Sequence, residues 1–206
     1  MKQLRIEDID LEGVKAVVFD LDGTLYDKHH LAWYLIFADL RHALWIHAER
    51  IARKKLKGQD FGDADTFYKT MFSYISEKRN VPYQAVKEWY NESYMPSMTE
   101  ILYTHYQAAD YVLPLLKQLN ESGIKTIVLS DYGCVEDKIR AIGLEPKMFD
   151  YCVSAPELGG LKPNKQLYER LLKLMRVKPK EAMMIGDRMD TDGEGAEAAG
   201  MRYMII

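Results

Sequence analysis

The chain has 206 residues, of which 48% are hydrophobic, 29% charged and 11% aromatic, and its formal net charge is −3. This composition is that of a globular protein and excludes a disordered or fibrous chain, while the length allows one medium-sized domain or a domain that carries a smaller insertion. The slightly acidic balance argues against a general affinity for nucleic acid or for an anionic membrane surface.

The amino-terminal residues 1–8 are charged and lack the apolar stretch of an export signal. The longest apolar run, residues 31–38, is far shorter than the roughly 20 residues that a membrane-spanning helix needs. Cys134 and Cys152 have no metal-binding spacing, and they fit a reducing compartment. We therefore expect a cytoplasmic protein without a membrane partner.

Short apolar runs rich in β-branched or aromatic residues predict five strands, at 16–19, 126–129, 151–153, 182–185 and 203–206. These runs do not alternate apolar with polar residues, which is typical of strands that are buried on both faces of a parallel sheet. Helical patterns precede or separate the last four strands, at 110–122, 135–142, 164–176 and 191–199. The alternation of strand and helix predicts an α/β fold, a doubly wound, five-stranded Rossmann-like parallel sheet.

Residues 28–105 interrupt this alternation, because they show helical periodicity and no convincing strand. We predict one long helix from about residue 31 to 57, a second around 67–75, and a third that begins at Pro82. Such a length is too great for a loop of a compact domain. The sequence therefore predicts an all-helical cap at 28–105, inserted into an α/β core formed by residues 1–27 and 106–206.

The strongest chemical signal is Asp20-Leu21-Asp22-Gly23-Thr24, directly after the first predicted strand. Ligands of open parallel sheets bind at this carboxyl edge. The two carboxylates point to the same side if the chain stays extended, and they converge on one crevice if it turns at Gly23. A nucleophile and a general acid/base need such closeness, although acids exposed in an ordinary turn would give the same sequence.

Other predicted strand ends also carry polar groups. Ser130 follows the second strand, Lys162 precedes a helix, and Asp187 follows the fourth strand, with Asp192 close behind. Carboxylates that converge repel one another unless a counter-charge is present. Lys162 and a divalent cation would supply it, and oxygen-only ligands with positions left to water suit Mg²⁺.

At this point the sequence resembles a known family. The run Phe19-Asp20-Leu21-Asp22-Gly23-Thr24-Leu25 is similar to the first motif of the haloacid dehalogenase superfamily. Ser130, Lys162 with Pro163, and residues 186–192 resemble its second, third and fourth motifs, in the same order. The resemblance covers about residues 14–26 and 106–206, and the insertion resembles the family's alpha-helical cap of the first type.

The resemblance implies a catalytic role for each matched position. Asp20 would be the nucleophile that becomes an aspartyl phosphate. Asp22 would protonate the leaving alcohol and then activate the water that hydrolyses the intermediate. Ser130 would hydrogen-bond a phosphoryl oxygen, and Lys162 would pair with Asp20 and the phosphate. These roles suit phosphoryl transfer, which depends mostly on positioning and on neutralising charge.

The resemblance also implies Mg²⁺ as the cofactor, held by Asp20, Asp22 through its backbone carbonyl and Asp187, with Asp192 behind them. The implied substrate-binding residues are Gly23, Thr24, Ser130, Asp131 and Lys162. Asp131 departs from the pattern, since many relatives carry an uncharged residue there. A carboxylate aimed at a phosphate would repel it, so we expect Asp131 to point toward the cap or toward a backbone donor.

The resulting expectation is a Mg²⁺-dependent phosphohydrolase acting on a small phosphorylated metabolite, of the nucleoside or sugar monophosphate type. Asp22 supports it, because an alkoxide needs a proton to leave and a halide does not. A phosphomutase would use the same aspartyl phosphate, and a phosphonate hydrolase would need a lysine such as Lys28 for a Schiff base. A non-catalytic binding module would not need the complete set of polar strand ends. The small-molecule phosphate is the only expected partner, and the sequence leaves the oligomeric state open.

Overall fold

The computed structural model describes residues 9–206, so the expected lack of an export signal at 1–8 lies outside the described residues. Five parallel strands form one sheet in the order β3-β2-β1-β4-β5, which confirms the predicted fold class. The strands are β1 (Ala16–Asp20), β2 (Lys125–Ser130), β3 (Tyr151–Ser154), β4 (Ala182–Gly186) and β5 (Arg202–Ile205). Phe19 is in register with Val128 and Ile185, so the carboxyl ends of β1, β2 and β4 meet at one edge.

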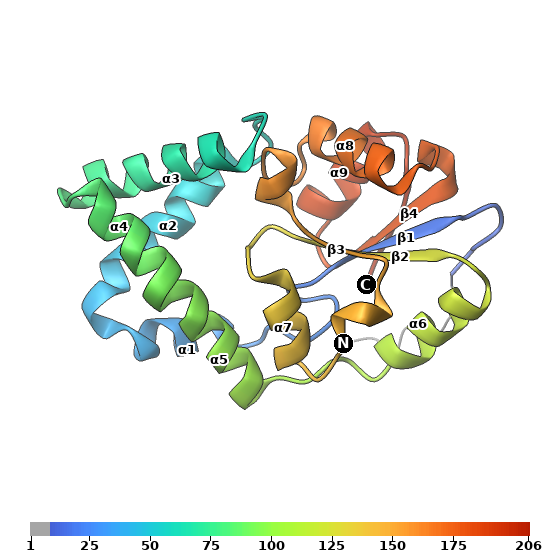
Figure 1. The fold of residues 1–206 in the computed structure, drawn as a ribbon, viewed down its shortest axis with the longest axis horizontal. Coiled ribbons are helices and arrows are strands. Elements are labelled where there is room, and N and C mark those ends of the chain that lie inside the picture. The colour runs from blue at the N-terminus through green and yellow to red at the C-terminus, as the bar shows by residue number, and fades with distance from the viewer. Residues whose placement is uncertain (1–8) are drawn as a thin grey trace.

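Helices cover both faces of the sheet (Figure 1). The faces are covered by α6 (Val112–Glu121) and α7 (Val135–Ala141) on one side, and by α8 (Lys165–Met175) and α9 (Glu194–Ala198) on the other. Along β1, Val17 and Phe19 belong to the hydrophobic cluster of α6 and α7, whereas Ala16 and Val18 belong to that of α8 and α9. Successive side chains of a strand point to opposite faces, which explains why the central strands β1 and β4 are apolar along nearly their whole length.

The helix predicted at 191–199 differs from the observed structure. Residues Met189–Gly193 form a π-helix, and α9 begins only at Glu194. The wider turn is closed by the backbone N–H of Gly193, which donates a hydrogen bond to the carbonyl oxygen of Arg188 at 3.4 Å; the same carbonyl also accepts one from the N–H of Asp192 at 2.9 Å. Such π turns often occur at functional sites. Short 3-10 turns complete the core at Pro146–Met148, Ala155–Leu158 and Pro179–Glu181.

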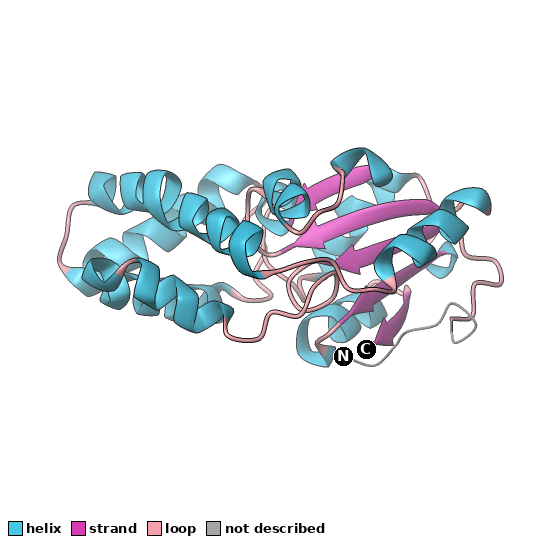
Figure 2. Ribbon diagram, turned by 90° about the horizontal axis from the view of Figure 1, so that it is seen from below, coloured by secondary structure: helices cyan, strands magenta, loops and turns pink. Residues whose placement is uncertain are grey.

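The helical insertion lies beyond the carboxyl edge, and Figure 2 shows the strands pointing toward it. It consists of α1 (Leu31–Ala38), α2 (Ala43–Leu56), α3 (Ala64–Arg79), α4 (Tyr83–Trp89) and α5 (Met95–His105), with a 3-10 turn at Leu40–His42 and a π-helix at Tyr90–Tyr94. Its buried aromatic residues, among them Phe67, Trp89 and Tyr94, form a hydrophobic cluster separate from those of the sheet. An inserted helical cap is therefore present between β1 and β2.

The single long helix predicted from about 31 to 57 is wrong, because Asp39 interrupts it between α1 and the 3-10 turn. Asp39 has a non-helical backbone, with φ −139° and ψ 65°. Its carboxylate accepts a hydrogen bond from Trp89 Nε1 at 3.0 Å and pairs with His42 at 2.8 Å. A tertiary contact with α4 thus outweighs the local helical pattern.

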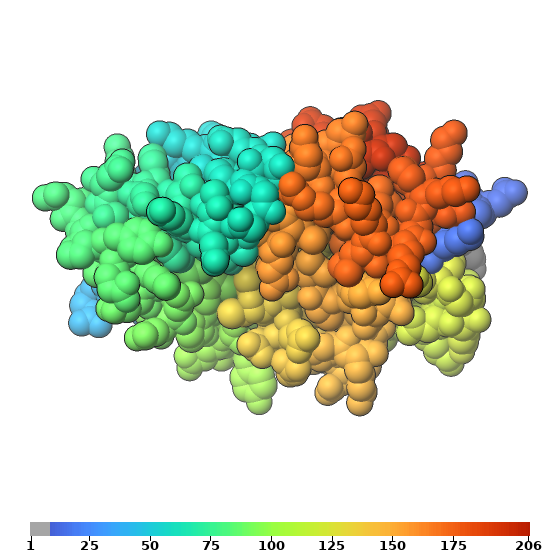
Figure 3. Space-filling model, turned by 45° about the horizontal axis from the view of Figure 1, so that its top comes forward, coloured from blue at the N-terminus to red at the C-terminus, as the bar shows by residue number. Residues whose placement is uncertain are grey.

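The cap also contacts the core beside the sheet, and Figure 3 shows the start of α3 against the segment that precedes α8. The backbone N–H of Phe61 donates to the carbonyl of Gly159 at 2.7 Å, and Asp60 pairs with Arg170. Lys57, at the end of α2, pairs with Asp190 in the loop after β4. None of the helices described in residues 9–206 is both long and apolar enough to cross a membrane.

Candidate active site

Asp20 is the last residue of β1, and it is almost completely buried. Thr24 Oγ1 donates a hydrogen bond to one of its carboxylate oxygens at 3.0 Å, and Lys162 Nζ contacts the other at 2.5 Å. Lys162 Nζ also contacts Asp192 Oδ1 at 2.6 Å, so one buried ammonium group pairs with two buried carboxylates. Burial raises the pKa of Asp20, the Lys162 charge lowers it, and the Asp192 charge raises it again, so that the pKa lies above its ordinary value.

The segment after β4 brings two further carboxylates to Asp20. The π-helix places the Asp192 side chain directly against Gly186, where a Cβ would overlap it, so a larger residue would not fit. Oxygen atoms of Asp20, Asp187 and Asp192 lie within 4.8 Å of one another. A compact set of carboxylate oxygens around partly accessible space is the donor chemistry that Mg²⁺ prefers. The site therefore fits a divalent cation.

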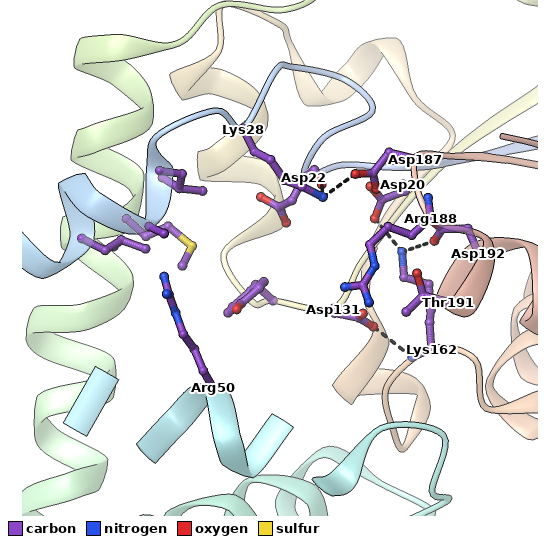
Figure 4. Close-up of a pocket in the computed structure, with 15 residues that line it drawn as sticks. Asp20, Asp22, Lys28, Arg50, Asp131, Lys162, Asp187, Arg188, Thr191 and Asp192 are labelled. Atoms are coloured by element: carbon purple, nitrogen blue, oxygen red, sulfur yellow. Dashed lines mark hydrogen bonds and ion pairs between the residues drawn. The ribbon is translucent and has the colours of Figure 1, made fainter. Parts of the chain in front are cut away.

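The carboxylate of Asp22 lies apart from that of Asp20, toward the cap (Figure 4). Lys138 Nζ contacts both of its oxygens, including Oδ2 at 2.6 Å. Tyr26 Oη donates to Oδ1 at 2.5 Å, and Ser130 Oγ donates to Oδ2 at 3.0 Å. Burial alone would raise the pKa of Asp22, but the Lys138 charge and these hydrogen bonds lower it below its ordinary value. This arrangement holds Asp22 as an ionised carboxylate.

Lys28 approaches the acidic cluster from the linker between β1 and α1. Its Nζ donates to the backbone carbonyl of Asp22 at 2.8 Å and forms an ion pair with Asp187 (Figure 4). The Lys28 side chain is 40% exposed, whereas that of Asp187 is 19% exposed. Asp20 and Asp192 thus share the Lys162 ammonium group, whereas Asp22 pairs with Lys138 and Asp187 with Lys28.

A cavity of about 450 Å³ lies between the cap and the carboxyl edge of the sheet. Its polar lining comes mostly from the core and its apolar lining mostly from the cap. Arg50 is a charged exception from α2, and Figure 4 shows it extending into the cavity. The lining residues are Asp20, Asp22, Lys28, Leu31, Ala32, Leu35, Arg50, Met98, Asp131, Tyr132, Lys162, Asp187, Arg188, Thr191 and Asp192. This volume is in the range of small-molecule sites.

Some residues expected to bind substrate lie behind the acids. Thr24 and Ser130 are fully buried and hydrogen-bond Asp20 and Asp22, respectively. Gly23 has a left-handed backbone with φ 104°, and an added Cβ would lie 2.6 Å from Lys28 Nζ, so glycine is required there. As expected, Asp131 faces a backbone donor, because its carboxylate accepts a hydrogen bond from the Lys162 N–H at 3.0 Å.

Sequence reasoning missed Lys138, although a signal was present. Val135, Lys138, Ile139 and Ile142 occur at helical spacing, so the lysine lies on the apolar face of α7. A lysine at such a position is rarely buried unless a carboxylate pairs with it. Asp22 is this partner, and the side chain of Lys138 is 0% exposed.

Sequence reasoning also missed Arg53, because a basic run such as residues 53–57 is typical of a solvated helix end. The side chain is instead buried between the cap and the core. Nη1 donates to the backbone carbonyl of Asp131 at 2.8 Å, and Nη2 donates to Tyr90 Oη at 2.7 Å. Burial would lower the pKa of Arg53, but Tyr90 and the buried Glu49 paired with it raise the pKa well above its ordinary value. Arg53 therefore links α2 to the loop that follows β2.

Known proteins resemble the chain over nearly its whole length. The curated relatives include glyceraldehyde 3-phosphate phosphatases of two archaea. That of Pyrococcus furiosus is 24% identical and covers 93% of this chain and 80% of its own. That of Methanothermobacter thermautotrophicus is 27% identical and covers 94% of this chain and 85% of its own.

Solved structures share the fold at low identity. The HAD-hydrolase YfnB from Bacillus subtilis bound to magnesium is 18% identical, with a TM-score of 0.66, and the match covers 94% of this chain and 88% of that one. A 2-haloacid dehalogenase from Pseudomonas syringae is 22% identical, with a TM-score of 0.64 and coverages of 93% and 86%. The sequence matches the haloacid dehalogenase-like hydrolase family over residues 14–200. Together with the parallel sheet, the inserted helical cap and the acidic cluster at the carboxyl edge, this match means that the chain belongs to the haloacid dehalogenase-like hydrolases.

Proposed function

We propose that this hydrolase is a Mg²⁺-dependent phosphatase that cleaves a small phosphorylated metabolite through an aspartyl phosphate on Asp20. The observation that carries the proposal is the contact of Asp20 with Lys162 at the floor of a cavity that Asp187 and Asp192 also line. A buried carboxylate beside an ammonium group and further acids is suited to attack on a phosphoryl group whose charge must be neutralised.

Asp20 and Asp187, together with the backbone carbonyl of Asp22, would hold Mg²⁺, and Asp192 would stand behind them through its contact with Lys162. When bound, the ion supplies positive charge that keeps Asp20 ionised and draws in the phosphoryl oxygens. Lys162 adds a second positive charge at the Asp20 carboxylate. Burial and the Asp192 charge hold the pKa of Asp20 above its ordinary value although Lys162 lowers it, so a further positive charge would favour the nucleophilic form.

In the first proposed step, an Asp20 oxygen forms a bond to phosphorus while the bond from phosphorus to the leaving alkoxide breaks. Asp22 gives its proton to the alkoxide, and this requires the Asp22 carboxyl group to be protonated and to turn toward the substrate. In the second step, water attacks phosphorus and gives a proton to Asp22, and the bond to Asp20 breaks. Asp22 in its ionised form, paired with Lys138, is ready for this second step.

The cavity supports a small substrate, because its volume of about 450 Å³ suits a metabolite and the cap covers it. Sugar or nucleoside monophosphates fit this description, and the glyceraldehyde 3-phosphate phosphatases among the relatives make triose phosphates the first members to test. Thr24 and Ser130 would act through Asp20 and Asp22, whereas Asp131 and Lys162 line the cavity itself.

The phosphonate alternative receives no support from Lys28, because an ammonium group bound to Asp187 and to a carbonyl oxygen is not a free amine nucleophile. A phosphomutase remains a second candidate, since it needs the same Asp20 and Asp22. The two differ in whether phosphate is released or moved to another hydroxyl.

The test is phosphate release from a panel of triose, hexose and nucleoside monophosphates, with and without Mg²⁺. We expect release that needs Mg²⁺ and that Asp20→Asn abolishes. Asp190→Asn is the matched control, because this acid belongs to the same segment as Asp192 but pairs with Lys57 outside the proposed ligand set. Release by Asp20→Asn at the wild-type rate, or no release from any substrate, refutes the proposal; isomerised substrate without free phosphate favours the mutase.

A further inference from the structure

The Lys28 ammonium group contacts two of the oxygen ligands proposed for the metal. Its Nζ lies 2.8 Å from the Asp22 carbonyl oxygen and forms an ion pair with the Asp187 carboxylate. Gly23 leaves room for this arrangement, since an added Cβ there would overlap both Lys28 Nζ and the Asp187 carboxylate. The glycine of the first motif therefore leaves the space that the contact of Lys28 with Asp187 occupies.

A metal ion bound to the same two oxygens would lie within contact distance of this ammonium group, and the two positive charges would repel each other. The net charge of the acidic cluster also argues against the presence of both cations at once. Asp20, Asp187 and Asp192 carry three negative charges, and Lys162 and Lys28 carry two positive ones. Exchange of the Lys28 ammonium for a divalent ion would make this cluster neutral, whereas the presence of both would leave it positive.

We propose that Lys28 is an internal counter-ion that takes the cation position when no metal is bound, and that Mg²⁺ must displace it to enter. The inference rests on the metal site of the proposed function, but it concerns the affinity for the ion and not the turnover.

The exposure of Lys28 and its place in the chain make displacement of its side chain feasible. The side chain is 40% exposed, so it can leave Asp187 without opening the core. The backbone carbonyl of Lys28 accepts a hydrogen bond from the N–H of Leu31 at 3.1 Å, at the first residue of α1. Lys28 therefore lies in the linker that joins the sheet to the cap, next to the start of α1. The released ammonium group stays at the cavity, where an anionic phosphate would attract it.

The first experiment measures Mg²⁺ binding by calorimetry in the absence of phosphate, with Mn²⁺ as a second probe. Lys28→Met should bind both ions about tenfold more tightly than the wild type, which is the order of effect of losing one charged hydrogen-bonded competitor. Lys57→Met is the matched control, because it removes a lysine whose partner Asp190 lies in the same segment as Asp187. Equal affinity in wild type and Lys28→Met, or an equal gain in Lys57→Met, overturns the proposal.

A second experiment uses the wild-type protein and so does not depend on the folding of a variant. An amine-acylating reagent is applied with and without saturating Mg²⁺, and modification of Lys28 is followed by peptide mass spectrometry. We expect Mg²⁺ to accelerate acylation of Lys28 several-fold, with Lys15 as an exposed internal reference. An unchanged or slower reaction at Lys28 contradicts displacement.

These outcomes can be separated from failure of the proposed function. Tighter Mg²⁺ binding by Lys28→Met without phosphate release from any substrate would support the counter-ion and refute the phosphatase. Mg²⁺-dependent phosphate release together with wild-type Mg²⁺ affinity in Lys28→Met would support the phosphatase and refute the counter-ion. Absence of Mg²⁺ binding in both proteins would refute both.

Discussion

Replacement of Lys138 by methionine removes the charge that neutralises Asp22 while keeping the length of the side chain. The lysine side chain is 0% exposed and that of Asp22 is 16% exposed, so little water can take over the lost interaction. Tyr26 and Ser130 would still donate to the carboxylate, but both are neutral donors. The variant would therefore leave a carboxylate that is nearly buried and unpaired.

Breaking a buried ion pair by removal of one partner costs about 3–5 kcal/mol. We expect about 2–4 kcal/mol for Lys138→Met, because Asp22 keeps two hydrogen bonds and some exposure. For a chain of this size, such a loss lowers the melting temperature by roughly 5–15 °C.

The low pKa of Asp22 fixes the sign of the pH dependence of this contribution to stability. Its contribution is complete above the ordinary value of 3.8 and is lost as the pH falls through the lower folded-state pKa.

The assay is urea and thermal unfolding of a double-mutant cycle with Asp22→Asn. Lys138→Met should cost much less in the Asp22→Asn background, because the neutral amide needs no counter-charge. Lys117→Met, on the exposed side of α6, controls for loss of a lysine and should change the stability little. An equal cost of Lys138→Met in both backgrounds would refute the reasoning.

Three further outcomes follow from the same contacts. Asp22→Asn should slow turnover and let the phosphoenzyme accumulate with p-nitrophenyl phosphate, which acid quenching detects; unchanged turnover would exclude the acid/base role. Arg53→Met leaves Glu49 buried without its partner, so urea unfolding should show a loss of about 3–5 kcal/mol, and proteolysis should cut the cap more readily than in Arg50→Met. Chelation with EDTA should stop phosphate release, and added Mg²⁺ should restore it; release that persists in EDTA would argue against the metal site.

The fold was predictable where the hydrophobic pattern of a segment matches its burial in the structure. Strands such as Ala182–Gly186 are apolar throughout because helices cover both faces of the sheet, and this pattern is visible in the sequence. Polar residues at the strand ends then stand out, so Asp20 and Asp187 could be assigned to one edge from order alone. The close contact of Asp20 with Lys162 joins positions 142 residues apart, and sequence order could not fix its geometry.

Prediction failed where a tertiary contact determined the local structure. Asp39 ends α1 because Trp89 and His42 bind its carboxylate, and Trp89 lies far outside the helix that the periodicity suggests. Lys138 and Arg53 lie at buried helix positions that look unfavourable for a charge until the partner is known. Lys138 pairs with Asp22 from another segment, and Arg53, although Glu49 of the same helix pairs with it, is buried against the Asp131 carbonyl of the core, so neither burial could be recognised from one helix alone.

Asp20 and Asp22 are close in sequence, yet their environments shift their pKa values in opposite directions. Burial among other acids raises that of Asp20, whereas Lys138 lowers that of Asp22. The proposed nucleophile Asp20 must be ionised, so this role depends on cations at the floor of the cavity. A proton donor must be protonated, so Asp22 in its contact with Lys138 is a base and not an acid. The first proposed step therefore requires the Asp22 carboxyl group to break its contacts with Lys138, Tyr26 and Ser130. We expect a bound substrate to provide the new hydrogen-bond partner that this movement needs.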